Sequence, residues 1–549
     1  MSGSTDRAFF GHPKGLANLF FTEMWERFSY YGMRAFLIFY LGAPAELGGQ
    51  GMYDKVKDAP LPIAGAIVGM FGASVYLLGL PGGWIADRFL GQRKAVTIGG
   101  IGIALGNGVL AIPGLGDGMY IGLVLIAMGT GFLKPNISTL VGQLYDEDDP
   151  RRDSGYTIYY MGINIGAFFA PLACGYLAQD PSFRGFLVEQ GINPNHCWHF
   201  AFGLAAIGMV GGLIQYTLWN KWLGDAGLKP TIPEDPARAE RDRTVLKVII
   251  GALVAIGVIV VVTKPSADLI KEVMGIGLII GSIVLFVGLY KAARDARERR
   301  GILAMLPLYL GAISFFAIFE QAPTTLNIFA EELTNRCVLG EQVLDAAGKI
   351  TCASGFYVPA SYYQSVNAIF IVALAPVFAF LWVWLARRRK EPTSVAKFAI
   401  GMVLLALAFV VMIPHSAAKN SNSFMYLVGL YFFYTLAELC ISPVGLSSMS
   451  KLAPKRLAGM VMGMWFFGTA IGIYLAGRAT SISSGKGFDY LFTFLLIASL
   501  VVSAALFVVA PLIKKMMGAN ATATAPAGKS EKAEPEPLPT ARVHKDKDD

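Results

Sequence analysis

The sequence predicts an all-α polytopic membrane protein, and two observations support this. Of the 549 residues, 54% are hydrophobic and only 15% are charged, whereas soluble domains average about 25% charged residues. About 14 stretches are also apolar over roughly 20 residues each, the length that crosses the hydrocarbon core of a bilayer. Because backbone polar groups in lipid must bond within their own segment, these stretches are predicted to be helices. The alternating pattern of a membrane β-barrel is absent.

The helices are expected in two units of six, with a pair between them. The individual segments are predicted near residues 17–41, 63–85, 95–113, 119–142, 156–178, 199–222, 244–263, 272–291, 302–329, 361–385, 396–413, 424–448, 456–480 and 489–513. The domain organisation that follows is a cytoplasmic N-terminus over 1–16, a six-helix unit over 17–222, a linker with a two-helix hairpin over 223–301, a second six-helix unit over 302–513 and a disordered cytoplasmic tail over 514–549.

Composition distinguishes the hairpin and the tail from the rest. Segments 244–263 and 272–291 carry almost no polar residue in their interiors, and charged stretches at 224–243 and 291–300 flank them. This pattern predicts an insertion between the two six-helix units. The residues from 518 onward are rich in Ala, Pro, Glu and Lys, which is typical of disorder.

The basic residues predict the orientation. Lys and Arg cluster in alternate loops, such as 88–94, 294–300 and 387–390, and these loops hold roughly three times as many as the others. The positive-inside rule then puts both termini in the cytoplasm, with the chain in the cell inner membrane. Since the net charge of +8 comes from these short clusters, it does not indicate a nucleic-acid partner. Residues 1–15 are polar, so no secretory signal is expected before the first helix.

The cysteines offer one candidate pair. Cys174 and Cys440 lie in apolar segments and are expected to pack there. Cys337 and Cys352 fall in a predicted external loop, where an oxidising compartment would allow a disulfide. Free thiols are an equal alternative for this pair.

Ionisable residues inside the apolar segments carry the functional signal, since charges in lipid normally face a bundle interior or a water-filled path. In the first segment, Glu23, Glu26, Arg27, Tyr30 and Arg34 fall within an arc of about 100° on a helix. Their spacings of three and four residues place them on one face. The stripe predicts a proton relay combined with a carboxylate-binding site. The alternative is a static network of ion pairs that fixes helix packing.

Three more charges interrupt later segments. Lys134 lies in the first six-helix unit, whereas Glu320 and Glu438 lie in the second. A cationic wall facing an anionic wall suits a zwitterion whose charged ends are apart. Pairs between Lys134 and Glu438, and between Arg34 and Glu320, could also form and break between two states. For Glu320 the alternative is a side chain that reaches toward the membrane interface, which fits Glu438 less well.

Two amide side chains, Asn164 and Asn367, also lie in the middle of apolar segments. Each is expected either to contact a substrate or to form an interhelical hydrogen bond.

Five motifs resemble those of a known family. Residues 83–93 (GWIADRFLGQR) resemble the loop between helices two and three of the major facilitator superfamily, where Asp and Arg side chains bridge neighbouring helices on the cytoplasmic side. Residues 23–32 (EMWERFSYYG) resemble the ExxERFxYY signature of the proton-dependent oligopeptide transporter family. Residues 159–168 are similar to its FYxxINxG signature, with tyrosine at 159 in place of phenylalanine. Residues 132–136 (FLKPN) and 438–445 (ELCISPVG) also match, and the resemblance runs from about residue 14 to 513.

The resemblance implies both a fold and an activity. The fold is that of the major facilitator superfamily, with two six-helix halves around a central cavity and the extra hairpin of prokaryotic members. The activity is proton-coupled import of di- and tripeptides by alternating access of the two halves. No cofactor is implied, because the proton gradient supplies the energy. The partners are peptides, protons and the lipid bilayer, and the functional unit is a monomer.

The resemblance also assigns roles to individual residues. The proton-coupling residues are Glu23, Glu26 and Arg27. The peptide carboxylate is assigned to Arg34 and Lys134, with Arg27 as a third candidate, and the amino group to Glu438, Asn164 and Asn367. Side-chain pockets are assigned to Tyr31, Tyr40, Tyr76 and Trp465, and to Phe316, where many members carry tryptophan. The gates are assigned to Arg34–Glu320 outside and Lys134–Glu438 inside, with Asp87, Arg88 and Arg93 in the cytoplasmic loop.

Three other functions compete with this interpretation. A carrier of organic anions or nitrate with the same fold predicts no requirement for a free amine and no role for Glu438. A channel or receptor with a fixed polar core predicts conductance or signalling without saturable, proton-dependent uptake. An enzyme has little support, since the sequence shows no metal-ligand spacing and no nucleophile–base constellation, and it contains only five His.

Overall fold

The computed structural model describes residues 6–54, 59–60, 62–146, 149–231, 235–263, 266–338, 340, 342–344, 350–416, 422–452 and 455–517. The helices are α1 (Lys14–Gly42), α2 (Pro62–Ile85), α3 (Gln92–Leu110), α4 (Gly118–Gln143), α5 (Arg152–Gln179), α6 (Pro181–Glu189), α7 (Cys197–Leu218), α8 (Pro236–Thr263), α9 (Ala267–Ala292), α10 (Ala296–Phe319), α11 (Thr325–Glu332), α12 (Gln364–Arg387), α13 (Ser394–Met412), α14 (Met425–Leu452), α15 (Ala458–Lys486) and α16 (Phe488–Met517). The short strands are β1 (Tyr53–Asp54), β2 (Ala59–Pro60), β3 (Thr334–Asn335), β4 (Cys337–Val338), β5 (Gln342–Leu344), β6 (Ile350–Cys352), β7 (Phe356–Tyr357) and β8 (Asn422–Ser423).

The all-α polytopic prediction is confirmed. Each predicted segment corresponds to a helix, namely α1–α5, α7–α10 and α12–α16. Among the described residues, 11 helices are long and apolar enough to cross a membrane by length and composition alone. Helix α1 is not one of these helices, because every stretch of 18 residues in it contains more than two charged side chains. Those charges are the ones that the sequence marked as functional.

Three details of the prediction were wrong or incomplete. Segment 302–329 is not one helix, because α10 ends at Phe319 and α11 begins at Thr325. Pro323 lies in the break, and proline lacks the N–H that a continuous helix requires. The first residues of the predicted tail, 514–517, belong to α16, which continues to Met517, and the rest of that tail, 518–549, lies outside the described residues. Helix α6 and the strands had not been predicted.

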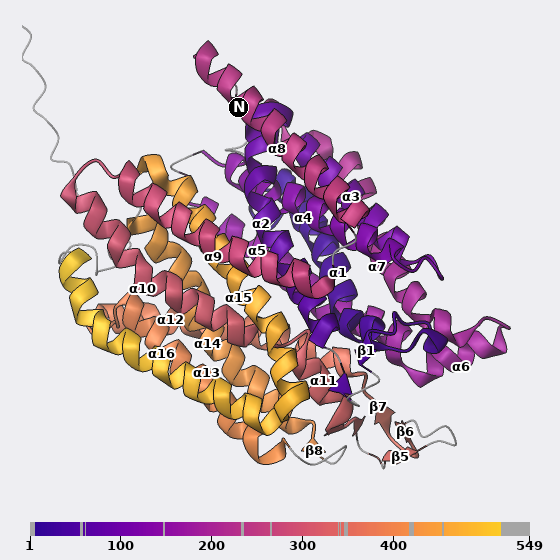
Figure 1. Cartoon of the computed structure of the whole chain (residues 1–549). Coiled ribbons are helices and arrows are strands. Elements are labelled where there is room, and N and C mark those ends of the chain that lie inside the picture. The colour runs from indigo at the N-terminus through magenta and orange to yellow at the C-terminus, as the bar shows by residue number, and fades with distance from the viewer. Residues whose placement is uncertain are drawn as a thin grey trace, which may run out of the picture.

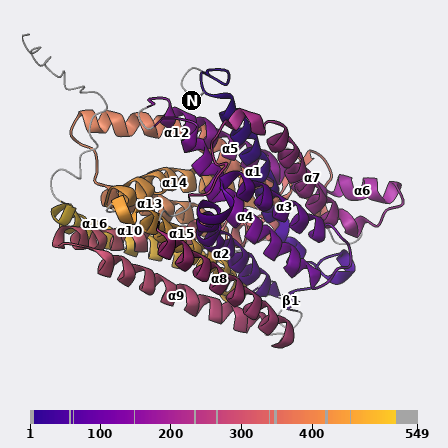
Figure 2. The ribbon, with the colours of Figure 1, turned by 90° about the horizontal axis from the view of Figure 1, so that it is seen from above.

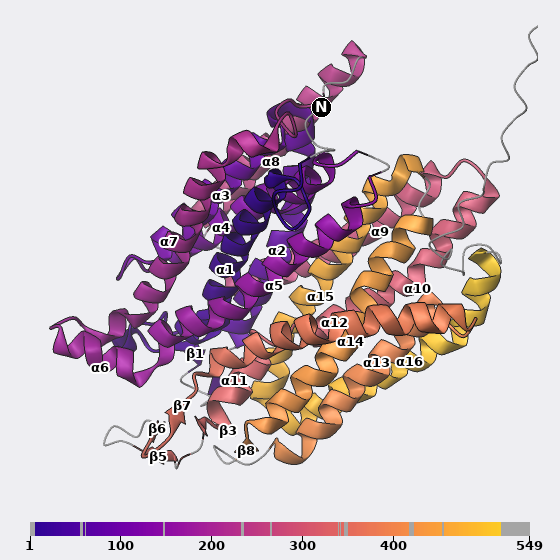
Figure 3. The same ribbon diagram turned by 180° about the vertical axis from the view of Figure 1, so that it is seen from behind.

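The helices form two halves. In the first half α1 packs against α5 and α7, while α4 packs against α2 and α3; in the second half α13 packs against α14 and α16, and α10 packs against α15. The halves meet along α2 with α15 and along α5 with α12. Figure 1 shows the indigo and magenta helices of the first half beside the orange and yellow helices of the second, and Figure 3 shows α5 and α12 from behind.

The two ends of the bundle are distinguished by α1, which begins at the end that we call proximal and ends at the one that we call distal. The short strands, α6 and α11 gather at the distal end (Figure 1). Strand β4 pairs with β7 and β5 with β6, all antiparallel, whereas β3 and β8 are parallel. These ladders give the distal loops their hydrogen-bond partners.

The predicted hairpin, α8 and α9, contacts both halves. Helix α9 lies along the outside of the bundle (Figure 2), against α15 and, less extensively, α2. The Tyr474 hydroxyl donates to the Lys271 carbonyl at 2.7 Å, and the hydroxyls of Ser282 and Tyr309 are 2.8 Å apart. These contacts attach α9 to the second half.

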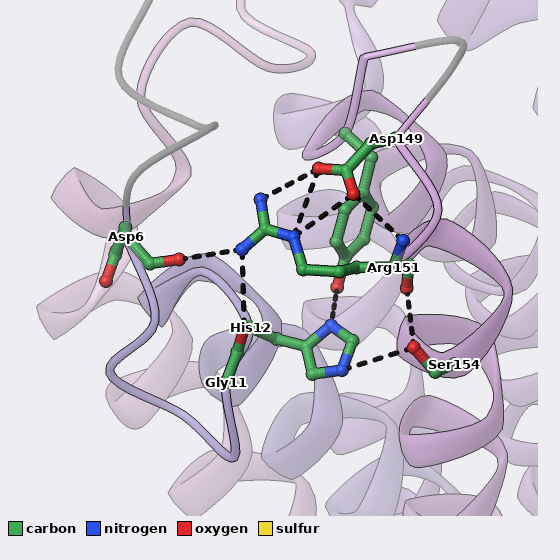
Figure 4. A network of polar contacts seen from close by, with 7 residues as sticks. Asp6, Gly11, His12, Asp149, Arg151 and Ser154 are labelled. Atoms are coloured by element: carbon green, nitrogen blue, oxygen red, sulfur yellow. Dashed lines mark hydrogen bonds and ion pairs between the residues drawn. The ribbon is translucent and has the colours of Figure 1, made fainter.

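A polar network holds the segment before α1 against the start of α5 at the proximal end. Its members are Asp6, Gly11, His12, Tyr145, Asp149, Arg151 and Ser154 (Figure 4). His12 Nδ1 is 2.9 Å from the Tyr145 hydroxyl, and Arg151 donates to the backbone carbonyls of Asp6 and Gly11 at 3.2 and 3.3 Å. Burial and the neighbouring Arg151 guanidinium lower the pKa of His12. The neutral imidazole is therefore the form that suits this network.

Candidate functional site

The charged stripe on α1 lies inside the first half. The side chains of Glu23, Glu26 and Arg27 are 1%, 0% and 3% exposed. Arg27 Nε is 3.3 Å from Glu23 Oε1, and Arg27 also forms an ion pair with Glu26. The Arg27 guanidinium lies 5.2 and 5.8 Å from the ring centres of Tyr30 and Tyr31, within the range of cation–π contacts. One arginine thus serves two carboxylates and two aromatic rings.

This cluster has unused hydrogen-bonding capacity. Glu23 Oε2, Glu26 Oε1 and Arg27 Nη2 are buried and have no hydrogen-bond partner among the residues that the structure describes. A buried charged group that lacks partners is costly. An arrangement in which a proton binds one of the two carboxylates would reduce that cost, because a single arginine then balances a single negative charge.

Arg34, two turns beyond Arg27, joins the two halves. It forms an ion pair with Glu320, the residue that follows α10. Next to it, the Ala35 carbonyl accepts from Asn327 of α11 at 2.7 Å and from Gln364 of α12 at 3.1 Å. The sequence marked Arg34 and Glu320, but it gave no signal for the two amides, since their role depends on the approach of another helix.

Two further polar contacts join α5 to the start of α12. The Ser365 hydroxyl donates to the Phe168 carbonyl at 2.8 Å, and the Ser361 N–H donates to Gln179 Oε1 at 3.2 Å. Together with the contacts around Arg34, these bonds join the two halves, and all of them lie toward the distal end. The distal end is therefore closed in this structure.

Lys134 and Glu438 stand on opposite halves and do not pair. Among the described residues, neither has an ion-pair partner within 4.0 Å. The Lys134 ammonium lies 4.4 Å from the centre of the Tyr76 ring. Glu438 Oε2 accepts from Asn367 Nδ2 at 3.1 Å, and the same amide donates to the Thr435 hydroxyl at 3.0 Å. The predicted inner pair is thus separated in this state of the molecule.

The remaining amide, Asn164, is placed differently from Asn367. Its Nδ2 donates to the Tyr160 carbonyl one turn earlier on α5, at 2.9 Å. The side chain is 5% exposed. The structure therefore joins Asn367 to Glu438 and leaves Asn164 bonded to its own helix.

The aromatic residues of the predicted pockets fall into two groups. Phe316 and Trp465 meet edge to face with ring centres 6.2 Å apart, and Tyr76 is 6.4 Å from Phe466, so α2, α10 and α15 bring these rings together. Tyr31 contacts Arg27, as described above. Tyr40 is different, because it packs on Trp198 and Phe202 of α7 and accepts from Gln50 at 2.6 Å. It lies in the core of the first half, not with the other rings.

The loop between α2 and α3 contacts the linker that follows α7. Arg93 donates to the carbonyls of Gly224 and Ala226, and Arg88 Nε is 3.6 Å from Asp242 of α8. The Asp87 side chain accepts from Gln92 at 2.7 Å, and its backbone carbonyl accepts from Thr231 at 2.7 Å. The sequence predicted bridges between neighbouring helices, and the structure places these bonds mainly on the linker.

Cys337 and Cys352 form a disulfide at the distal end, with Cα atoms 5.6 Å apart. The two alternatives that the sequence left open are thereby resolved in the structure. Cys174 and Cys440 are buried free thiols, and Cys197 is also buried. The described part of the chain holds no group of three or more His, Cys, Asp or Glu side chains that could bind a metal ion.

Comparison with known proteins places this site in a family. The model of the POT family matches residues 93–487. An uncharacterised transporter of Bacillus subtilis, YclF, is 38% identical over 519 residues, which cover 93% of this chain and 96% of the relative. A di-/tripeptide transporter of Lactococcus lactis subsp. cremoris is 35% identical over 527 residues, covering 94% of this chain and 98% of the relative.

A solved structure has the same architecture. A crystal structure of the peptide transporter POT in complex with sulfate superposes with a TM-score of 0.80 at 36% sequence identity, covering 94% of this chain and 98% of that one. The family match spans more than half of the chain, and the similarity extends over nearly its whole length. This chain is therefore a member of the POT family of transporters.

Proposed function

We propose that this chain is a proton-coupled symporter that imports di- and tripeptides by alternating access. The observation that carries the proposal is the position of unpaired groups on the two halves. Lys134 faces an aromatic ring and Glu438 faces an amide, and no ion pair joins them. The two ends of a short peptide are a carboxylate and an ammonium group, which complement these two side chains. The di-/tripeptide transporter among the relatives supports the same substrate class.

In this proposal the peptide ends are fixed and its side chains are loosely held. Lys134 and Arg34 bind the carboxylate, while Glu438 and Asn367 bind the ammonium group. Asn164 joins the latter only if it leaves its bond to Tyr160. Hydrogen bonds between charged groups are about twice as strong as neutral ones, so the ends dominate affinity. Apolar pockets discriminate weakly between side chains, and a broad range of peptides follows.

The pockets themselves would come from the rings that the two halves bring together. Tyr31 and Tyr76 lie on the first half, and Phe316 and Trp465 lie on the second. Phenylalanine at 316 gives a smaller and less polar wall than tryptophan would. Tyr40 is assigned to the core of the first half instead of to a pocket.

Proton coupling is assigned to Glu23, Glu26 and Arg27. With both carboxylates ionised, Arg27 is held by two negative charges and the cluster has one negative charge in excess. Binding of one proton neutralises that excess. A carboxylate whose proton affinity depends on its neighbour's charge is what coupling requires. The proton then leaves when the site opens to the compartment with fewer protons.

Alternating access would exchange one set of ion pairs for another. The distal contacts, led by Arg34–Glu320, break when the outside opens. Lys134 and Glu438 approach when the proximal end closes. The proximal end is assigned to the cytoplasm of the inner membrane, with both termini there. The proton gradient is the energy source, no cofactor takes part, and a monomer is sufficient.

Uptake by the purified protein in liposomes tests the proposal. Labelled dialanine should accumulate under an inward proton gradient, and an ionophore should abolish this. Unlabelled di- and tripeptides should compete, while free alanine and N-acetyl-dialanine should not. Glu438→Gln should abolish uptake. Glu272→Gln should preserve it, because among the described residues Glu272 of the hairpin helix α9 only forms an exposed ion pair with Arg478 of α15. Uptake competed by organic anions without an amino group would instead point to an anion carrier.

A further inference from the structure

Tyr159 departs from the signature that the rest of its segment follows. The FYxxINxG signature has phenylalanine there, and this chain has a tyrosine. The side chain is 5% exposed. A buried hydroxyl costs free energy unless it forms a hydrogen bond. The extra oxygen therefore needs partners inside the first half.

The fold brings this hydroxyl to α1 and α4. Helix α5 approaches α1 closely at Gly162, where an added Cβ would lie 2.9 Å from the Phe20 carbonyl oxygen. Only a residue without a side chain allows that approach. One turn earlier on the same face, the Tyr159 hydroxyl lies 3.4 Å from Ser138 Oγ on α4 and beside the Glu23 carboxylate on α1.

Each neighbour offers an acceptor. Ser138 donates its own proton to the Lys134 carbonyl at 3.2 Å, which leaves its lone pairs available to Tyr159. Glu23 Oε1 contacts Arg27, whereas Glu23 Oε2 is buried without a hydrogen-bond partner among the described residues. A hydroxyl rotates about its C–O bond, so Tyr159 has a choice of two acceptors on neighbouring helices.

The choice depends on the charge of Glu23. The titratable groups that face Glu23 are Glu26 and Arg27 on α1, Lys134 on α4 and Tyr159 on α5. Of these, only the tyrosine is a neutral donor. It favours an ionised carboxylate by donating to it, since hydrogen bonds to charged acceptors are the stronger ones. When Glu23 carries a proton, Ser138 becomes the better acceptor.

We propose that Tyr159 is a positioning residue for proton coupling, whose hydroxyl donates to Glu23 when the carboxylate is ionised and to Ser138 when it is protonated. The tyrosine keeps its own proton throughout, so the only proton that is carried is the one that binds Glu23 and later leaves it. The switch sets the pH range in which transport is driven. The inference rests on the proposed function, in which Glu23 takes part in coupling.

The test measures two activities in liposomes as a function of external pH. One is peptide uptake driven by an inward proton gradient, and the other is peptide exchange with the same pH on both sides. Tyr159→Phe should leave exchange within about twofold of the wild type. It should shift the pH of half-maximal driven uptake upward by about one unit, the effect of losing one hydrogen bond to a charged group. Ser138→Ala removes the other acceptor and should shift the profile downward.

The matched control is Tyr156→Phe. The Tyr156 hydroxyl donates to the Ser138 carbonyl at 3.2 Å. The substitution therefore also removes a tyrosine hydroxyl, one turn away from Tyr159. Its profile should match the wild type. An unchanged profile in Tyr159→Phe, or an equal loss of exchange and driven uptake, would overturn the inference. Failure of the wild type to show proton-driven uptake would reject the proposed function itself, and the two failures are thereby distinguished.

Discussion

The ion pair between Arg34 and Glu320 is expected to hold the distal end closed, and Glu320→Gln tests this. The two side chains are 8% and 11% exposed. Glutamine is similar in size to glutamate but uncharged, so the substitution leaves the Arg34 guanidinium buried without a counter-ion. Arg34 Nε already has no partner among the described residues. The closed state is therefore destabilised relative to an open state in which water reaches Arg34.

The magnitude follows from the burial of the pair. Removal of one partner from a buried ion pair costs about 3–5 kcal/mol. The hydrogen bonds from Asn327 and Gln364 to the Ala35 carbonyl remain, and they do not depend on Glu320. We take about 3 kcal/mol, because the pair is slightly exposed. At about 1.4 kcal/mol per factor of ten, the ratio of closed to open molecules should fall by about 100-fold.

Thiol accessibility measures that ratio. Ser361 is 0% exposed, and its side chain faces Gly175 of the opposite half, so Ser361→Cys is a reporter that reacts only when the distal end opens. In liposomes, Glu320→Gln should raise its rate of maleimide labelling at least tenfold. Glu331→Gln is the control, because it removes a distal ion pair with Arg336 inside one half. An unchanged rate in Glu320→Gln, or an equal rise in the control, would refute the reasoning.

Three further outcomes are expected. Glu438→Gln should weaken the binding of dialanine to the purified protein at least tenfold, measured by titration calorimetry, whereas N-acetyl-dialanine, which lacks the ammonium group, should bind neither the variant nor the wild type. Burial and Arg151 lower the pKa of His12, so the unfolded chain binds more protons than the folded one below about pH 6.5. The contribution of His12 to the free energy of unfolding should therefore be present in full above that pH and be lost as the pH falls through the folded-state pKa of His12. His12→Gln should flatten this pH dependence, measured by thermal unfolding between pH 7.5 and 5. Cys337→Ser should lower stability by about 3 kcal/mol, because the bond to Cys352 closes a loop with a sequence separation of 15; an unchanged midpoint in denaturant would contradict this.

The helical segments were predictable because lipid leaves few solutions to a chain. A polar backbone in hydrocarbon must satisfy its own hydrogen bonds, so apolar length alone indicates a helix. The places where the prediction was wrong lie at or beyond the ends of the long apolar helices. Helix α6 is short and half polar, and the break between α10 and α11 falls at the distal end. At this break protein side chains satisfy backbone groups, as the Tyr434 hydroxyl does for the Ile318 carbonyl at 3.0 Å, so length alone no longer decides the conformation.

The sequence by itself determined the polar face of α1, because spacings of three and four residues fall on one side of any helix. It also determined the family, through motifs that are each a short continuous stretch of the sequence. Contacts between segments were decided only by the tertiary structure. Arg34 and Glu320 are 286 residues apart, and Lys134 and Glu438 are separated in this state although their charges would allow a pair. Charge and spacing define which side chains are able to interact, whereas the packing of the two halves decides which of them meet.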